Sequence, residues 1–471
     1  CSIMNKKIFI LIFILLPNLP GFSQAPVKKD TSTVAPKDDY YQPNAIVPAV
    51  KKDTLAVVPE IDDYQSNTVL RYEDVVYEKN IKSVQLYNEG FELSQPIIEL
   101  GSGEGLKLCF DDLDADLKDY SLTLIHCNAY WQPSNLMPLE YIDGFEDIEI
   151  INFSYSARTV QNYTHYTAFI PTMNTRITKS GNYLIKVFHR EDENKLVLSK
   201  RFMVLENKVN VKAKVHPAST IENRNYKQEV DFSIFHDDYV IDNPYQNLKV
   251  IIVQNNRPDN AVSTLQPSFI NDMQIDYNYE EDNVFTGGSE FRNFDTRSLV
   301  YKSARISKIN KDSSKITITL LPDERRTFLR YSFTNDINGN FIIKSTDPQR
   351  DSSAINAEYC YINFFVPYVE TFDNGSFYVF GAFNGWKCTK ENKMKFNMNR
   401  LGYEATLYLK QGYYNYEYVF LENGKTVADE TVIEGMHSET ENEYTIYVYY
   451  KQQGSFYDRL VGVGHINSIK F

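Results

Sequence analysis

Residues 83–131, SVQLYNEGFELSQPIIELGSGEGLKLCFDDLDADLKDYSLTLIHCNAYW, decide the fold class of this chain. In GLKLCFD the side chains of Leu106, Leu108 and Phe110 alternate with others and so fall on one face of an extended chain. The segment YSLTLIHC, residues 120–127, alternates in the same way, and this period of two is typical of strands with at least one buried face. The polar segment DLDADLKDY between them predicts a solvated turn. We therefore expect the two strands to form a β-hairpin of a sandwich.

The same alternation continues along the chain, broken by Gly, Asn, Asp and Pro at intervals typical of β-sandwiches. The 35 Tyr and 29 Phe also favour strands, because aromatic side chains pack well on a pleated surface. In the first part of the chain, strands are expected at 83–87, 96–100, 105–111, 120–127, 150–156, 163–170, 182–189 and 198–205. The sequence predicts an all-β protein with an N-terminal sandwich at 71–207, a middle β domain at 208–367, a C-terminal sandwich at 368–452 and a tail at 453–471.

The N-terminal segment has the pattern of a cleaved secretory signal peptide, predicted at residues 1–23. Lys6 and Lys7 form a basic start, nine apolar residues follow at 8–16, and small residues precede Gln24. Nine residues are too few to cross a bilayer core, which needs about 20 in a helix. We expect export and no direct membrane span.

Residues 24–70 are predicted to be a disordered linker. VKKDTSTVAPKDDY recurs imperfectly as VKKDTLAVVPEIDDY, and Pro, Lys and Asp interrupt every apolar run. Such a segment buries too little apolar area to offset the entropy of ordering its backbone. The alternative is that the repeat binds a partner.

Charge and motifs exclude several classes of function. The formal net charge of −13 argues against nucleic acid and anionic membranes as partners, because these are bound by clustered Lys and Arg. The motifs HExxH, GxSxG, GxxxxGK[ST] and CxxC do not occur. The sequence predicts no enzyme activity and no cofactor. A hydrolase using paired carboxylates in a cleft remains an alternative.

The acidic turn offers the one weak metal candidate, Asp112, Asp114 and Asp116, which place carboxylates at alternate positions as calcium loops do. Leu117 and Thr123 stand where an EF-hand requires Gly and Glu, so a solvated turn is favoured and loose cation binding stays open.

The cysteines do not form a disulfide framework. Buried free thiols are the default expectation for Cys109, Cys127, Cys360 and Cys388. Cys109 and Cys127 are expected on neighbouring strands and could form a disulfide if their Cβ atoms come within about 4.5 Å.

The segment 276–299 interrupts the predicted middle domain. It is long and polar, and FTGGSEFRNFD mixes aromatic side chains, glycines and charges as a contact loop would. Aromatic and Arg side chains are the usual anchors of protein interfaces, so Phe291, Arg292 and Phe294 are predicted to contact a partner.

Ordered strings along the chain resemble the plug protein of the Bacteroidota type IX secretion system. They include IIELGSGEGLKLCFDDLDADLKDYSLTLIHCNAYWQPS, EYIDGF, YTHY, SGNYLIKV, KRFMV, FTGGSEFRNFDTRSL, DINGNF, FYVFGAFNGW and LKQGYYNYEYVF, from about residue 77 to the end. The resemblance implies a non-enzymatic periplasmic subunit that binds and seals the periplasmic opening of the outer-membrane translocon barrel. The barrel and its accessory subunits are the implied partners.

The C-terminal segment 368–452 resembles the early-set immunoglobulin-like sandwich of glycogen-binding modules. FYVFGAFNGW and QGYYNYEYVF correspond to the G-x-F-N-x-W start and G-x-Y-x-Y strand of those modules, and Trp386 stands where their sugar-stacking Trp lies. Glu417 replaces their Lys, and the turn ENGKT lacks their second Trp. Trp386 is therefore expected to lie in the core or to contact a partner, and an exported carbohydrate-binding protein is the alternative function.

Overall fold

The computed structural model describes residues 69–347 and 352–469. The predicted signal peptide, residues 1–23, and nearly all of the predicted linker, residues 24–70, lie outside the described residues. The described chain is almost all β-structure, which confirms the predicted fold class of tandem sandwiches. Its helices are α1 (Pro138–Tyr141), α2 (Pro244–Asn247), α3 (Ser353–Asn356) and the 3₁₀ helix η1 (Ala382–Asn384). None of them has the length and apolar character needed to cross a membrane.

The first sandwich packs two sheets around one apolar core, whose members lie between residues 81 and 204. One sheet has the order β2 (Ile81–Asn88), β4 (Leu106–Asp112), β9 (Thr164–Ile170), β8 (Asn152–Tyr155). The facing strands are β7 (Asp147–Glu149), β5 (Tyr120–Cys127), β11 (Gly181–His189) and β12 (Asp192–Leu205), with β1 (Val75–Val76) and β3 (Ile97–Glu99) also paired to β12. A separate pair consists of β6 (Ile142–Gly144) and β10 (Thr175–Ile177). Leu106, Leu108 and Phe110 are all in the core, as their alternation predicts.

The predicted hairpin of β4 and β5 is wrong. β4 pairs with β2 and β9, whereas β5 pairs with β11 and β7, so the connection crosses from one sheet to the other. The connection also begins inside the protein, because the buried Asp112 carboxylate accepts hydrogen bonds from Tyr120 (3.0 Å) and Asn80 (2.7 Å). Cys109 and Cys127 consequently lie in opposite sheets, and both are buried free thiols.

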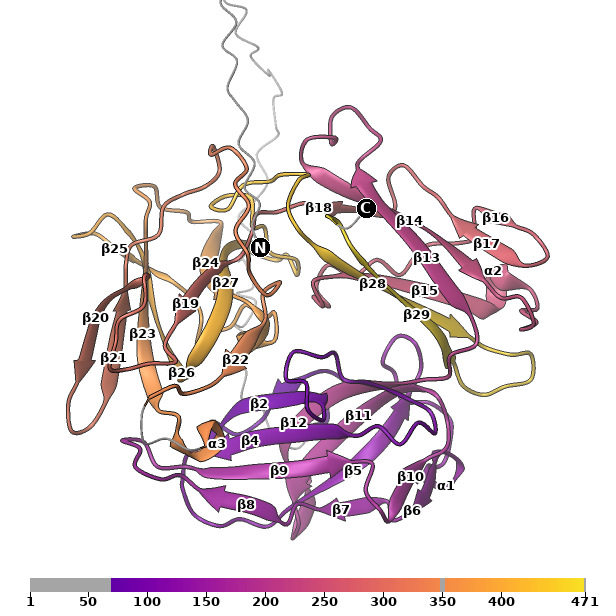
Figure 1. Ribbon diagram of the computed structural model, residues 1–471, viewed down its shortest axis with the longest axis horizontal. Helices are drawn as coiled ribbons and strands as arrows, with labels where there is room; N and C mark the ends of the chain where they lie inside the picture. The colour runs from indigo at the N-terminus through magenta and orange to yellow at the C-terminus, as the bar shows by residue number, and fades with distance from the viewer. Residues whose placement is uncertain (1–68, 348–351, 470–471) are drawn as a thin grey trace, which may run out of the picture. The chain divides into compact units, whose positions relative to one another are not determined.

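The second sandwich is built from two separate stretches of the chain. One sheet contains β13 (Asn210–Pro217), β14 (Lys227–Phe235), β17 (Gln274–Tyr277) and β16 (Phe269–Ile270), with β18 (Val284–Thr286) also paired to β14. The facing strands are β15 (Leu248–Gln254), β28 (Glu443–Tyr450) and β29 (Arg459–Asn467). Figure 1 shows the yellow β28 and β29 beside the pink β13 and β15. β29 meets β12 at the parallel pair Leu205 and Leu460, which makes these strands and the β12 sheet one nine-stranded sheet.

The third sandwich occupies the chain between these two stretches. One sheet has the order β20 (Ile306–Lys311), β21 (Ile316–Leu320), β23 (Tyr359–Pro367), β26 (Gly402–Lys410), β25 (Lys395–Asn397). The other contains β19 (Arg292–Asp295), β27 (Gly412–Glu422), β22 (Phe341–Ile343) and β24 (Gly375–Phe380). Its core includes Tyr414, Tyr416, Tyr418 and Phe420, the face predicted from GYYNYEYVF.

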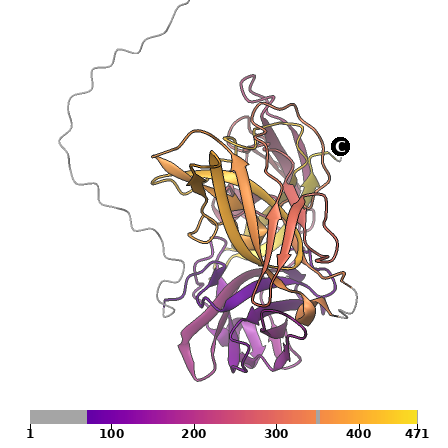
Figure 2. The same ribbon diagram turned by 90° about the vertical axis from the view of Figure 1, so that its left-hand side faces the viewer.

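The predicted limits of the middle domain (208–367), the C-terminal domain (368–452) and the tail (453–471) do not follow these cores. β19 to β23 fall in the predicted middle domain but pack in the third sandwich. β28 pairs with all of β15, and β29, in the predicted tail, pairs with β28. The chain thus leaves the second sandwich and returns to complete it. The indigo-to-magenta strands of the first sandwich, by contrast, stay together in both views (Figure 1 and Figure 2).

Candidate functional site: buried charges and an exposed edge

A heavily buried charge cluster centres on Asp111 in β4. Asp111 lies on the face of β4 opposite Phe110 and is completely buried. Its Oδ2 accepts hydrogen bonds from Lys410 Nζ (2.5 Å) and Tyr359 (2.6 Å), and its Oδ1 lies 2.6 Å from His165 Nδ1. Lys410 and Tyr359 belong to β26 and β23, so the cluster joins the first sandwich to the third.

The electrostatics of this cluster favour an ionised Asp111. Burial alone would raise the pKa of Asp111, but the charges of Lys410 and His165 and their hydrogen bonds hold it below its usual value. Burial lowers the pKa of Lys410 more than Asp111 raises it. Burial lowers the pKa of His165, but hydrogen bonds and charge interactions with Asp111 and Cys109 outweigh it, so this pKa lies above its usual value.

A second joint pairs the second sandwich with the third. Arg257 Nη1 lies 3.0 Å from Glu417 Oε1 and its Nη2 lies 2.9 Å from Asp259, with both Arg257 and Glu417 buried. Glu417 comes from the face of β27 opposite the core tyrosines. Burial raises the pKa of Glu417, although the charge of Arg257 opposes this.

The predicted partner contacts Phe291, Arg292 and Phe294 are internal, and the segment 276–299 contains β18, β19 and the end of β17 where a contact loop was expected. Phe294 is in the core, stacked on Tyr414 with ring centroids 5.1 Å apart. Arg292 binds the buried Glu434 through Nε (2.9 Å). The prediction that these side chains anchor a partner does not fit their burial.

Trp386 lies in the core, which was one of its two predicted places. It is 7% exposed, packs edge-on against Phe291 and Phe380 at 5.9 and 5.4 Å, and has the Arg257 guanidinium over its ring at 5.5 Å. A ring covered in this way cannot stack on a sugar. The carbohydrate-binding alternative therefore loses the aromatic side chain on which it depended.

The carboxylates of the acidic turn form ion pairs with a lysine of the same turn. Lys118 Nζ lies 2.8 Å from Asp112, 2.5 Å from Asp114 and 3.5 Å from Asp116. Burial lowers the pKa of Lys118, but hydrogen bonds and charge interactions with Asp112 and Asp114 raise it by more than burial lowers it. The ammonium therefore stays charged. The lysine supplies the positive charge that a metal ion would have brought.

A group of three acids, Glu290, Asp336 and Glu441, lies where the chain passes between the second and third sandwiches. Their carboxylate oxygens approach within 4.8 Å of one another. Asp336 accepts hydrogen bonds from the backbone of Phe291 (2.6 Å) and Asn338 (2.7 Å). Burial, together with the charges of Glu290 and Glu441, raises the pKa of Asp336 to about 7.

The first sandwich has an exposed apolar edge. β8 is the last strand of its sheet, and all four of its residues are exposed. An edge strand presents unpaired backbone groups to which another chain can pair. Exposed apolar side chains are also frequent in the sequence on either side of β8, within residues 137–173. They are Met137, Leu139, Phe145, Ile151, Phe153, Tyr155, Val160, Phe169 and Met173.

Sequence reasoning did not foresee that Asp111, Lys410 and Glu417 are buried and form charge pairs. Lys410 ends an alternating strand, and Glu417 interrupts the run of aromatic residues in GYYNYEYVF. A charged residue within an apolar strand is the signal that could have marked them, because such a residue is either exposed or paired.

These features define a protein of tandem β-sandwiches held together by buried charge pairs. Residues 81–206 match the family model of the type 9 secretion system plug protein 1st domain. A crystal structure of a hypothetical protein from Parabacteroides merdae ATCC 43184 is 33% identical, with a TM-score of 0.81 over 85% of this chain and 100% of that chain. No curated protein sequence matches this one. The first sandwich, residues 81–206, therefore belongs to the family of type 9 secretion system plug protein first domains. That family is not a known enzyme family.

Proposed function

We propose that this protein is the periplasmic plug of a type IX secretion system, which binds and seals the periplasmic opening of the outer-membrane translocon barrel. The observation that carries the proposal is the plug-family first sandwich, whose β8 edge is exposed while β4 and β9 are fixed to the third sandwich through Asp111. A body whose sandwiches are locked together can occlude a pore without unfolding.

We propose the β8 edge and the apolar residues around it as the docking surface for the barrel. Monomeric proteins rarely expose large apolar patches unless these bind something. A stable docking interface buries about 1,200–2,000 Å² in total and depends on a few central apolar anchors. Ile151 and Tyr155, which are 71% and 52% exposed, are the anchors proposed here. Release requires cargo or an accessory subunit to favour the undocked state.

The test is co-purification with the tagged barrel from outer membranes, using the full-length protein and the double variant Ile151→Glu/Tyr155→Glu. We expect the variant to recover at least about tenfold less barrel, because central anchors contribute more than about 1 kcal/mol each. Phe269→Glu/Met273→Glu, two equally exposed side chains of the second sandwich, is the matched control and should bind normally.

Deletion of the protein should make the outer membrane leaky to large solutes in cells that contain the barrel. No barrel in the wild-type eluate would overturn the plug function. Normal barrel recovery by the Ile151/Tyr155 variant would overturn the proposed docking surface and leave the function standing.

A further inference from the structure

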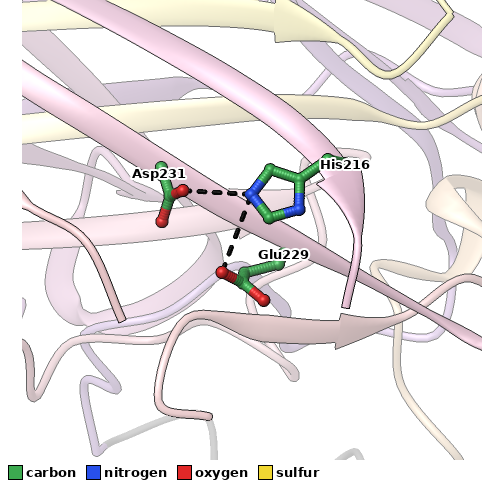
Figure 3. Close-up of side chains that lie close together, drawn as sticks. All are labelled: His216, Glu229 and Asp231. Carbon is green, nitrogen blue, oxygen red and sulfur yellow. Dashed lines mark hydrogen bonds and ion pairs between the residues drawn. The ribbon is translucent and has the colours of Figure 1, made fainter. Parts of the chain in front are cut away.

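His216, Glu229 and Asp231 converge on one face of the β13–β14 hairpin. In the antiparallel register His216 is opposite Glu229, and Lys214 is opposite Asp231. Because side chains alternate along a strand, the three residues share a face, while Val215 and Val230 between them point into the core. Figure 3 shows one nitrogen of the imidazole facing both carboxylates.

The donor atoms have the spacing of metal ligands. His216 Nε2 lies 3.0 Å from Asp231 Oδ2 and 3.6 Å from Glu229 Oε1. All three donor atoms lie within 4.8 Å of one another. Zn²⁺ binds His nitrogen and carboxylate oxygen at about 2.0–2.2 Å, which places tetrahedral ligands about 3.3–3.6 Å apart.

A hydrogen bond at the other ring nitrogen of His216 fixes the tautomer of the neutral ring. It shows which nitrogen carries the proton and which one has the lone pair that faces the carboxylates. His216 Nδ1 lies 2.9 Å from the carbonyl oxygen of Pro217, which can only accept, so Nδ1 carries the proton. The lone pair of Nε2 in a neutral ring then points at two negative groups. That arrangement requires a positive charge between them, either a proton on Nε2 or a metal ion.

Both carboxylates are oriented by neighbours outside the group. Glu229 is 2% exposed and accepts hydrogen bonds from the backbone N–H (2.7 Å) and the hydroxyl (3.2 Å) of Ser219. Asp231 accepts one from Asn283 Nδ2 (3.1 Å). Outer hydrogen bonds of this kind to every ligand are the usual support of metal sites. Lys214 is the nearest competing cation by register, and it is exposed.

We propose that His216, Glu229 and Asp231 bind a divalent first-row transition-metal ion, with Zn²⁺ as the probe. One imidazole and two carboxylates bring a charge of −2, which the ion neutralises. Three protein ligands leave at least one coordination position open, to be filled by water or by a donor of a docked partner. The ion would link β13, the edge strand of its sheet, to β14.

The test is titration of the full chain, purified without a polyhistidine tag and dialysed against a chelator, with ZnSO₄ in a calorimeter. We expect about one high-affinity ion per chain. Glu229→Gln and Asp231→Asn keep the shape of each side chain and should weaken binding at least about tenfold, and His216→Ala should weaken it further. The matched control is His236→Ala, since His236 Nδ1 also contacts a carbonyl oxygen (3.0 Å, Tyr239) but is in none of the groups of three or more potential metal ligands among the described residues.

X-ray absorption at the zinc edge of the wild-type protein gives a measurement that needs no variant. One imidazole nitrogen and oxygen ligands at about 2.0–2.2 Å are expected. Sulfur in the first shell, unchanged affinity in the two isosteric variants, or no binding by the wild type would each overturn the proposal. The barrel co-purification does not depend on this result.

Discussion

Asp111 of the first sandwich forms a buried ion pair with Lys410 of the third. Its carboxylate and the ammonium of Lys410 are both almost fully buried. Removing one partner of a buried pair leaves the other charge without compensation, which costs about 3–5 kcal/mol. The pair is therefore expected to affect stability far more than an exposed one does.

Asp111→Asn should lower the free energy of unfolding by about 3–5 kcal/mol, measured by urea denaturation followed by tyrosine fluorescence and circular dichroism. The double variant Asp111→Asn/Lys410→Met should be more stable than Asp111→Asn, because it removes the uncompensated ammonium. Arg176→Met, which breaks a pair exposed on both sides, is the control and should change stability by less than about 1 kcal/mol. Equal losses in all three variants would contradict the argument.

The burial of Asp111 shows where residue-scale prediction ends. Leu106, Leu108 and Phe110 could be assigned to a core from their spacing alone. Asp111 could not be, because its burial comes from Tyr359 and Lys410, which are about 250 and 300 residues further along the chain. The same holds for Arg292, whose partner Glu434 lies 142 positions away. Local pattern marks which face of a strand is apolar and leaves open what covers the other face.

At the scale of elements, strands were predictable and their partners were not. The ranges 105–111 and 182–189 anticipate β4 and β11 within one residue. The prediction that β4 pairs with β5 was wrong, and so was the prediction of a tail after residue 452. Both failed because strand pairing depends on contacts between distant segments. Alternation specifies that a strand has an apolar face and carries no information on its neighbour in the sheet.

The return of the chain to the second sandwich depends on two glycines of β29. A Cβ atom added at Gly462 would lie 2.5 Å from Val209 Cγ2, and one at Gly464 would lie 2.7 Å from Val211 Cγ1. Both distances are shorter than any ordinary carbon contact. β29 can lie against the start of β13 only because these positions lack side chains.

Gly462→Ala and Gly464→Ala should each lower the free energy of unfolding by about 1–3 kcal/mol, the usual cost of overpacking a core. Thermal unfolding measured by calorimetry provides the check. Gly105→Ala is the control, because its added methyl group would meet nothing nearer than 3.8 Å and its backbone is not left-handed. A neutral result at Gly462 and Gly464 would show that β29 does not pack this closely on β13.

At the scale of the molecule, the third sandwich is inserted between two halves of the second. Glu290 precedes β19 and Glu441 precedes β28, so the acids that meet Asp336 stand where the chain leaves and re-enters the second sandwich. Three neighbouring carboxylates repel one another when ionised. Burial raises the pKa of Glu290, although hydrogen bonds from Tyr331 and from the backbone of Glu441 oppose this.

These raised pKa values give stability a defined dependence on pH. The folded state binds protons more tightly than the unfolded state, whose Asp and Glu titrate near about 4. This contribution is therefore present at low pH and is lost as pH rises from about 4 through the folded pKa of Asp336, which is about 7. Above pH 7 this stabilisation by bound protons is absent.

Glu290→Gln tests this directly. Glu290 Oε1 accepts the hydroxyl of Tyr331 (2.6 Å) and the backbone N–H of Glu441 (3.1 Å), whereas Oε2 has no hydrogen-bond partner among the described residues. Gln keeps the first oxygen and offers an amide in place of the second. The variant should be more stable than wild type by about 1 kcal/mol at pH 8 and by little at pH 5, measured by urea denaturation at both pH values.

Glu439→Gln, a nearby exposed acid, should change stability by less than about 0.5 kcal/mol at either pH. A Glu290→Gln variant that is less stable than wild type at pH 8 would mean that Oε2 has a partner which only a carboxylate can hold, and the repulsion argument would fail.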